Sequence, residues 1–210
     1  MRIGLDFDNT IVSYDGLFHK VALENGIIPQ DTPVNKLAVR DYLRNVNQEV
    51  LWTEMQGYVY GARMDEANPY PGLIEALSSL KLRGHQLFII SHKTKYPYVG
   101  EQYDLHQASL AWITSHLQYL NLPLIEPSCI FFNATKDEKI QKISQMECDI
   151  FLDDLPEILL AAQFPAKTRR SLFDPEGHHA GLTHEDMTHH QSWKTFSNWV
   201  DKMVELNDFR

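Results

Sequence analysis

Short apolar runs that end in polar residues recur along the chain. They occupy residues 2–7, 86–90, 129–132 and 149–154, with 170–173 as a fifth candidate. Segments with the periodicity of amphipathic helices lie between them. Strands that alternate with helices are typical of a parallel sheet covered by helices on both faces. We therefore predict an α/β fold with a Rossmann-like parallel sheet.

The helical segments have apolar residues three and four positions apart. These segments are 73–83, 104–120, 136–146, 156–163 and 191–206. The first of them follows Pro71-Gly72 and stops before Gly84, as expected for a helix with a glycine just beyond its carboxyl end.

Residues 13–69 break this alternation. The interval has helical patterns but no convincing strand, and it ends in the turn-rich sequence NPYPG. We interpret it as a small helical cap inserted after the first strand, so that residues 1–12 and 70–210 form the core domain. An insertion at this point would lie over the carboxyl ends of the strands, where open α/β sheets bind ligands.

Polar residues suited to catalysis lie at the ends of three of the predicted strands. They are Asp6, Asp8 and Thr10 at the end of the first strand, Ser91, His92 and Lys93 at the end of the second, and Asp153 and Asp154 at the end of the fourth. Residues two apart in an extended strand point to the same side. Because parallel strands open their carboxyl ends onto one crevice, we expect these groups to converge.

Four carboxylates at one crevice do not all ionise readily without a cation: like charges at close range raise each other's pKa, or a metal neutralises them. Oxygen ligands of this kind favour Mg²⁺, which takes one or two carboxylates, waters and a substrate phosphate. A lysine from the helix before the fourth strand would also balance the charge. Both Lys136 and Lys139 are candidates, and the spacing to Asp153 favours Lys139.

These residues, in this order, resemble the haloacid dehalogenase superfamily. The resemblance covers roughly residues 1–173 and rests on Asp6-Phe7-Asp8-Asn9-Thr10, Ser91, Lys139 and Asp153-Asp154. It implies that Asp6 is a nucleophile that forms an aspartyl-phosphate and that Asp8 is a general acid and base. Thr10 and Ser91 would bind phosphoryl oxygens, and Lys139 would orient Asp6. Mg²⁺ would be ligated by Asp6, the Asp8 carbonyl and Asp153, with Asp154 direct or through water.

The resemblance also implies a subclass. Phosphatases of this superfamily carry the acid two residues after the nucleophile, whereas dehalogenases lack it, so Asp8 favours a phosphatase. The expected substrate is a small phosphorylated metabolite, either a sugar phosphate or a nucleotide. His92 and Lys93 are either substrate contacts or ordinary loop residues. A phosphotransferase or mutase with the same intermediate, and a non-catalytic phospho-ligand-binding module, remain the alternatives.

The charge limits the partners. With 28 acidic and 19 basic residues and a net charge of −9, the chain lacks the basic footprint that a nucleic acid polymer needs. No apolar stretch approaches the roughly 18 residues of a membrane span, and the first residues do not form a secretory signal. We expect a cytoplasmic protein without a membrane partner, either a monomer or a homodimer.

Cysteine and histidine usage adds two expectations. Cys129 and Cys148 lie beside apolar runs, which favours buried thiols over a disulfide. Five histidines gather within residues 178–190, where Gly181 and Thr183 indicate a loop rather than a helix that presents a zinc site.

Overall fold

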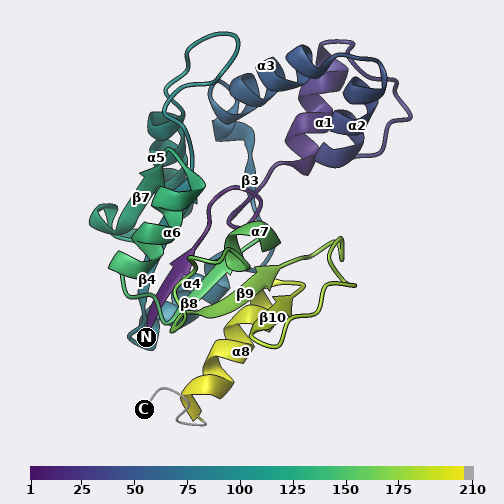
Figure 1. Ribbon diagram of the computed structural model, residues 1–210. Helices are drawn as coiled ribbons and strands as arrows, with labels where there is room; N and C mark the ends of the chain where they lie inside the picture. The colour runs from purple at the N-terminus through teal and green to yellow at the C-terminus, as the bar shows by residue number, and fades with distance from the viewer. Residues whose placement is uncertain (206–210) are drawn as a thin grey trace. The chain divides into compact units, whose positions relative to one another are not determined.

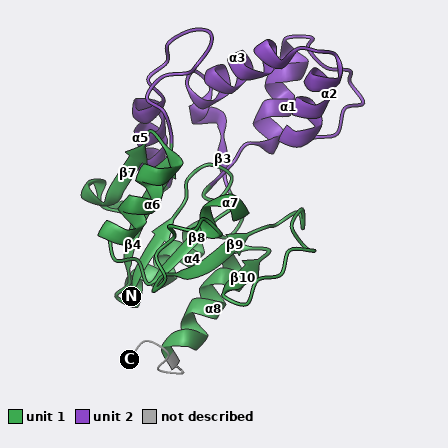
Figure 2. Ribbon diagram, viewed as in Figure 1, with its two compact units in different colours: residues 1–11, 70–92, 117–210 green, residues 12–69, 93–116 purple. Residues whose placement is uncertain are grey.

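The computed structural model describes residues 1–205. It divides into two compact units (Figure 2). Unit 1 comprises residues 1–11, 70–92 and 117–210, and unit 2 comprises residues 12–69 and 93–116. Residues 206–210, which include the last residue of the final predicted helix, lie outside the described residues.

Unit 1 is built on a six-stranded sheet with the order β10-β9-β8-β1-β4-β7, and every paired strand runs parallel to its neighbour (Figure 1). The strands are β1 (Arg2–Leu5), β4 (Gln86–His92), β7 (Ile130–Asn133), β8 (Ile150–Asp153), β9 (Arg169–Phe173) and β10 (Met187–His190). The helices of this unit are α4 (Leu73–Leu82), α6 (Lys136–Gln145), α7 (Pro156–Leu159) and α8 (Trp193–Glu205). This arrangement confirms the predicted α/β fold with a parallel sheet.

Alternating side chains divide the core of unit 1 between the two faces of the sheet. Phe88, Ile90 and Phe151 pack in one buried cluster with α6 and α7 residues such as Ile143 and Ile158. Side chains of a strand alternate between faces. Gly4 of β1 and Asp6, which continues the extended chain just beyond β1, therefore point to the same side, toward Phe151 and α6, and this sets the position of the site described below.

The structure differs from the sequence prediction at residues 117–123. The predicted helix 104–120 ends at His116, as α5 (Leu105–His116), and a small hairpin of β5 (Gln118–Tyr119) and β6 (Leu122–Pro123) follows. Leu120 and Asn121 have φ values of +51° and +61°. Two successive left-handed residues form the tight turn that joins such strands and cannot continue a right-handed helix.

The prediction of a loop over the whole histidine-rich segment was wrong at its end. Residues 187–190 form β10, which pairs with β9 through the register Met187–Arg170 to His190–Phe173. The sequence Met-Thr-His-His lacks an apolar alternation, so it carries a weak strand signal. Its backbone groups pair with those of β9, and this pairing between separate segments leaves no signal in the local sequence of residues 187–190.

Unit 2 contains α1 (Asp15–Glu24), α2 (Lys36–Asn45), α3 (Glu49–Tyr60), the short 3₁₀ helix η1 (Met64–Glu66) and α5. Aromatic rings form its centre, where the buried Phe18 packs against the buried Trp52 and the half-buried Tyr60 at centroid distances of 5.1 Å and 5.6 Å. Two-residue strands, β2 (Val12–Ser13) and β3 (Asn68–Pro69), pair where no strand was predicted. None of the described helices has the length and apolar character needed to cross a membrane.

Residues 93–116 pack with unit 2, although the sequence analysis placed them in the core domain. Trp112 of α5 donates its indole N–H to the carbonyl of Ala67 at 2.8 Å, and it is buried. Tyr103 approaches Gly61 so closely that a Cβ atom at position 61 would lie 2.3 Å from it. The role of residues 13–69 as a cap stays a prediction.

Candidate active site

Asp6 lies directly beyond β1 and is buried, with 4% of its surface exposed. Its backbone N–H still bonds to the carbonyl of Leu152 in β8 at 2.9 Å, so it continues the strand and faces α6. The chain then turns sharply. Asn9 has a φ of +58°, and the N–H of Ile11 bonds to the carbonyl of Phe7 at 3.0 Å.

Lys139 lies in the first turn of α6 and is fully buried, with 1% exposure. Its Nζ is 2.6 Å from Asp6 Oδ1 and 2.7 Å from Asp153 Oδ2. Lys136, the alternative from the sequence, forms an ion pair with Glu157 through side chains that are about half exposed. The structure therefore brings Lys139, and not Lys136, to the carboxylates.

The carboxylates of Asp6, Asp153 and Asp154 form a compact acidic cluster. Each offers a ligand oxygen, and these oxygens lie within 4.8 Å of one another. It is the one group of this kind within residues 1–205, and no histidine of the 178–190 segment belongs to such a group. An all-oxygen donor set with a single buried ammonium beside it fits Mg²⁺ or a similar hard cation better than zinc.

Burial and charge shift the pKa values at this cluster. Burial raises the pKa of Asp6 to about 7. The attraction of Lys139 lowers this pKa, whereas the repulsion of Asp153 and Asp8 raises it further. Burial alone would lower the pKa of Lys139, but Asp153 and Asp6 together outweigh it and raise that pKa above its ordinary range. The ammonium of Lys139 stays charged, but its attraction does not offset the effect of burial on Asp6.

Two hydroxyl groups of the predicted site are buried without a protein partner. Ser91 and Thr10 are 1% and 0% exposed, and neither side-chain oxygen has a hydrogen-bond partner among the described residues. Buried polar groups in folded proteins are almost always paired. Ser91 lies near the end of β4 and Thr10 in the turn that follows β1, both in unit 1, and orphaned hydroxyls of this kind are suited to bind the oxygens of a ligand.

The remaining predicted site residues lie in different surroundings. Asp8 is half-buried and close enough to influence the pKa of Asp6. His92 at the end of β4 is also half-buried and has its Nε2 3.1 Å from the carbonyl oxygen of Ala134; burial lowers its pKa. Lys93 belongs to unit 2, where it is buried with its Nζ 4.9 Å from the centroid of the Tyr60 ring.

The sequence analysis missed Asn133, whose side-chain amide donates to the carbonyl of Ser91 at 3.1 Å.

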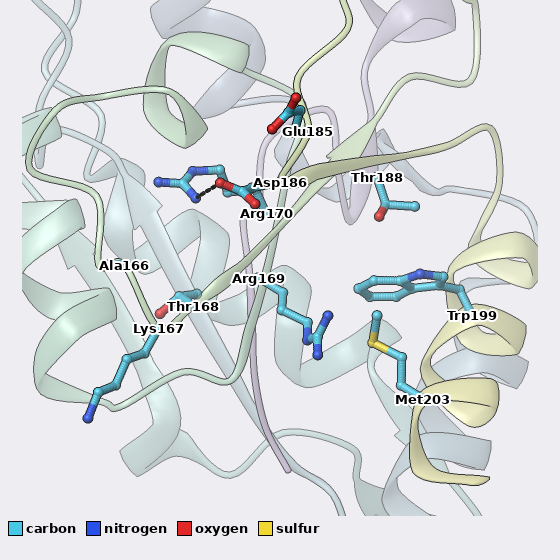
Figure 3. A pocket seen from close by; sticks show the side chains of 10 residues that line it. All are labelled: Ala166, Lys167, Thr168, Arg169, Arg170, Glu185, Asp186, Thr188, Trp199 and Met203. Carbon is cyan, nitrogen blue, oxygen red and sulfur yellow. Dashed lines mark ion pairs between the residues drawn. The ribbon is translucent and has the colours of Figure 1, made fainter. Parts of the chain in front are cut away.

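A separate pocket of about 230 Å³ lies between the start of β9 and the side of α8 (Figure 3). Its lining includes Arg169 and Arg170 of β9 and Trp199 and Met203 of α8. Arg169 pairs with the first residue of β8, whereas Asp153 is the last residue of that strand. The pocket is therefore at the opposite end of the strands from the carboxylates and is not part of this site.

Known proteins resemble the chain at low identity, and no family model matches it. A protein from Oceanobacillus iheyensis that bears the name "Putative nucleotidase" is 22% identical over 165 residues, which cover 76% of this chain and 79% of the relative. A haloacid dehalogenase-like family hydrolase from Xanthomonas campestris aligns with a TM-score of 0.57 at 8% identity, over 100% of this chain and 98% of that one. YfnB from Bacillus subtilis, bound to magnesium, aligns with a TM-score of 0.54 at 12% identity, over 94% and 96% of the chains.

Proposed function

We propose, from the premise that this chain has a haloacid dehalogenase-like fold, that it hydrolyses phosphomonoesters through an aspartyl-phosphate on Asp6. The observation that carries the proposal is the buried carboxylate of Asp6, which Lys139 holds by one oxygen at 2.6 Å within the Asp6–Asp153–Asp154 cluster. A carboxylate is a recognised covalent nucleophile when its surroundings orient it.

The first half of the reaction transfers the phosphoryl group to the protein. Because Lys139 contacts Oδ1 of Asp6, the other oxygen of this carboxylate is the one proposed to attack phosphorus. An Asp6 O–P bond forms while the ester P–O bond breaks. Asp8 donates a proton to the departing alcohol as general acid. The hydroxyls of Ser91 and Thr10 donate hydrogen bonds to the phosphoryl oxygens.

The second half releases inorganic phosphate. Water attacks the phosphorus of the aspartyl-phosphate, Asp8 accepts a proton from this water, and the bond between phosphorus and Asp6 breaks. Asp6 leaves as a carboxylate and is again stabilised by Lys139. Protons and charges balance over the two halves, because Asp8 gives one proton to the departing alcohol in the first half and takes one from water in the second, and so ends the turnover in the protonated form in which it began.

Mg²⁺ is the proposed cofactor. Asp6, Asp153, Asp154 and the backbone carbonyl of Asp8 would hold it, and it would neutralise the charge of the carboxylates and the phosphoryl oxygens. The raised pKa of Asp6 supports a cation here, since the protein's own positive charge does not compensate for the burial of this carboxylate.

The proposed substrate is a small phosphorylated metabolite. The name of the Oceanobacillus relative supports a nucleoside monophosphate, and a sugar phosphate is the second class to test. Direct contacts of His92 and Lys93 with the substrate stay predictions.

Phosphate release from a panel of nucleoside monophosphates and sugar phosphates tests the proposal, with Mg²⁺ and with EDTA. We expect metal-dependent hydrolysis that Asp6→Asn abolishes and Asp8→Asn lowers by about 10²- to 10⁴-fold. Asp31→Asn is the matched control, because Asp31 is exposed in unit 2. Full activity of Asp6→Asn would refute the aspartyl-phosphate. Transfer of phosphate to an added alcohol, with little free phosphate, would identify a phosphotransferase instead.

A further inference from the structure

Two side-chain hydrogen bonds join the end of β4 to residues 133–134, which end β7 and lead into α6. Asn133 donates its side-chain amide N–H to the carbonyl of Ser91 at 3.1 Å, and this bond is buried. His92 Nε2 is 3.1 Å from the carbonyl oxygen of Ala134. We call these two bonds, between residues 91–92 and 133–134, the β4–α6 clip.

The clip begins where the backbone ladder ends. The β4–β7 register runs from Ile89–Ile130 to His92–Asn133, and Asn133 is the last residue of β7. A carbonyl oxygen only accepts hydrogen bonds, so the Asn133 amide must present its N–H to Ser91, and His92 must carry its proton on Nε2. The two side chains thus extend the pairing of β4 beyond the strand itself.

The start of α6 is fixed immediately after the clip. The carboxylate of Glu138 accepts from the N–H groups of Ala134 and Thr135 at 2.9 Å and 3.1 Å, and Thr135 Oγ1 accepts from the N–H of Glu138 at 3.1 Å. This capping box sets where the helix begins. The N–H of Lys139 bonds to the carbonyl of Thr135 at 3.1 Å, so Lys139 takes its place from the same turn.

We infer that Asn133 is a positioning residue that holds the Ser91 hydroxyl and the Lys139 ammonium in a fixed relation. Its amide contacts the residue that carries the orphaned hydroxyl, and six residues later the same segment delivers Nζ to Asp6 at 2.6 Å. The inference rests on the proposed function, in which both groups serve one phosphoryl group. Small misplacements at reacting centres reduce rates strongly, so a rigid link between the two groups favours turnover.

Asn133→Asp tests the inference, because it keeps the size of the side chain and replaces the donor with an acceptor facing the Ser91 carbonyl. Asn198→Asp, on the exposed side of α8, has the same charge change and is the matched control. For Asn133→Asp we expect kcat to fall by about ten- to a hundred-fold, with KM changed by less than about three-fold. Asn198→Asp should match the parent protein.

The histidine half of the clip provides a conservative rescue. His92→Gln keeps an N–H donor for the Ala134 carbonyl and should retain kcat to within about three-fold, whereas His92→Leu should not. A role as a direct substrate contact predicts instead that both variants raise KM. If both variants lose kcat, or if neither does, the hydrogen bond of His92 is not what the clip contributes.

A double-mutant cycle separates failure of this inference from failure of the proposed function. Urea unfolding of Asn133→Ala, Lys139→Met and the combined variant needs no turnover, and alanine removes the amide without adding a charge. If the clip positions Lys139, the effects on the unfolding constant are non-additive by about five-fold or more; additivity within about two-fold would refute the inference. An inactive parent protein would overturn the proposed function, while the cycle would still decide the role of Asn133. If the parent is active and its Asn133→Asp variant retains kcat, the inferred role of Asn133 is wrong and the proposed function stands.

Discussion

Replacement of Lys139 by methionine tests the electrostatic balance of the site. Methionine fills similar space but removes the ammonium that lies 2.6 Å from Asp6 and 2.7 Å from Asp153. Removal of one partner from a buried ion pair typically costs about 3–5 kcal/mol of unfolding free energy, because the other charge is left uncompensated. With two carboxylates and 1% exposure of Lys139, we expect a loss toward the upper end of that range.

Lys136→Met is the matched control. Lys136 lies in the same helix one turn earlier, and its ion pair with Glu157 is solvent-exposed on both sides. Pairs of this kind contribute about 0–1 kcal/mol. Urea denaturation in EDTA at pH 7.5 measures both variants. An equal effect of the two substitutions would refute the assignment of Lys139 as the buried counter-charge of the cluster.

The pH dependence gives a second check on the same variant. The pKa of Asp6 is already raised to about 7, well above its unfolded value of 3.8, by burial. Without Lys139 it must rise further. The folded protein then keeps a proton that the unfolded chain has released, so the stability of the variant increases as pH falls from 8 toward 5. We expect its deficit relative to the parent protein to shrink over that interval; a constant deficit would contradict this account.

Two further substitutions test the packing of unit 1. Burial lowers the pKa of His190 to about 4, so stability should fall by up to about 3 kcal/mol as pH drops from 6.5 to 4 while the unfolded histidine takes up a proton. His190→Phe should flatten that part of a stability–pH curve, and an unchanged slope would refute the assignment. Gly4→Ala places a Cβ 2.5 Å from the Phe151 ring and should cost about 1–3 kcal/mol in thermal unfolding. Gly16→Ala should cost nothing, because its added Cβ meets no atom within 4 Å apart from its chain neighbours and the backbone of its own helix. Equal stability of the two alanine variants would contradict the packing described here.

Local patterns predicted much of the chain because strands and helices leave periodic signatures. The runs around Leu5, Ile89 and Leu152 are buried strands in the structure, and the polar residues that follow them are at one end of the sheet. A parallel sheet converts position in the sequence into position in space, since every strand in it ends on the same edge. Asp6 and Asp153 could therefore be placed together from the sequence, as the structure shows.

The choice between Lys136 and Lys139 depended on tertiary structure. Both flank the same acidic pair and have the same local pattern, and only the packing of α6 against Phe151 decides which ammonium is buried. The same holds for β10, whose partner β9 supplies the pairing, and for residues 93–116, which pack with unit 2. The Asn133–Ser91 bond joins residues 42 positions apart. Periodicity indicates which face of a helix or strand is apolar, but it does not indicate which distant element packs on that face. The burial of Lys139, the pairing of β10 and the Asn133–Ser91 bond all depend on such long-range packing.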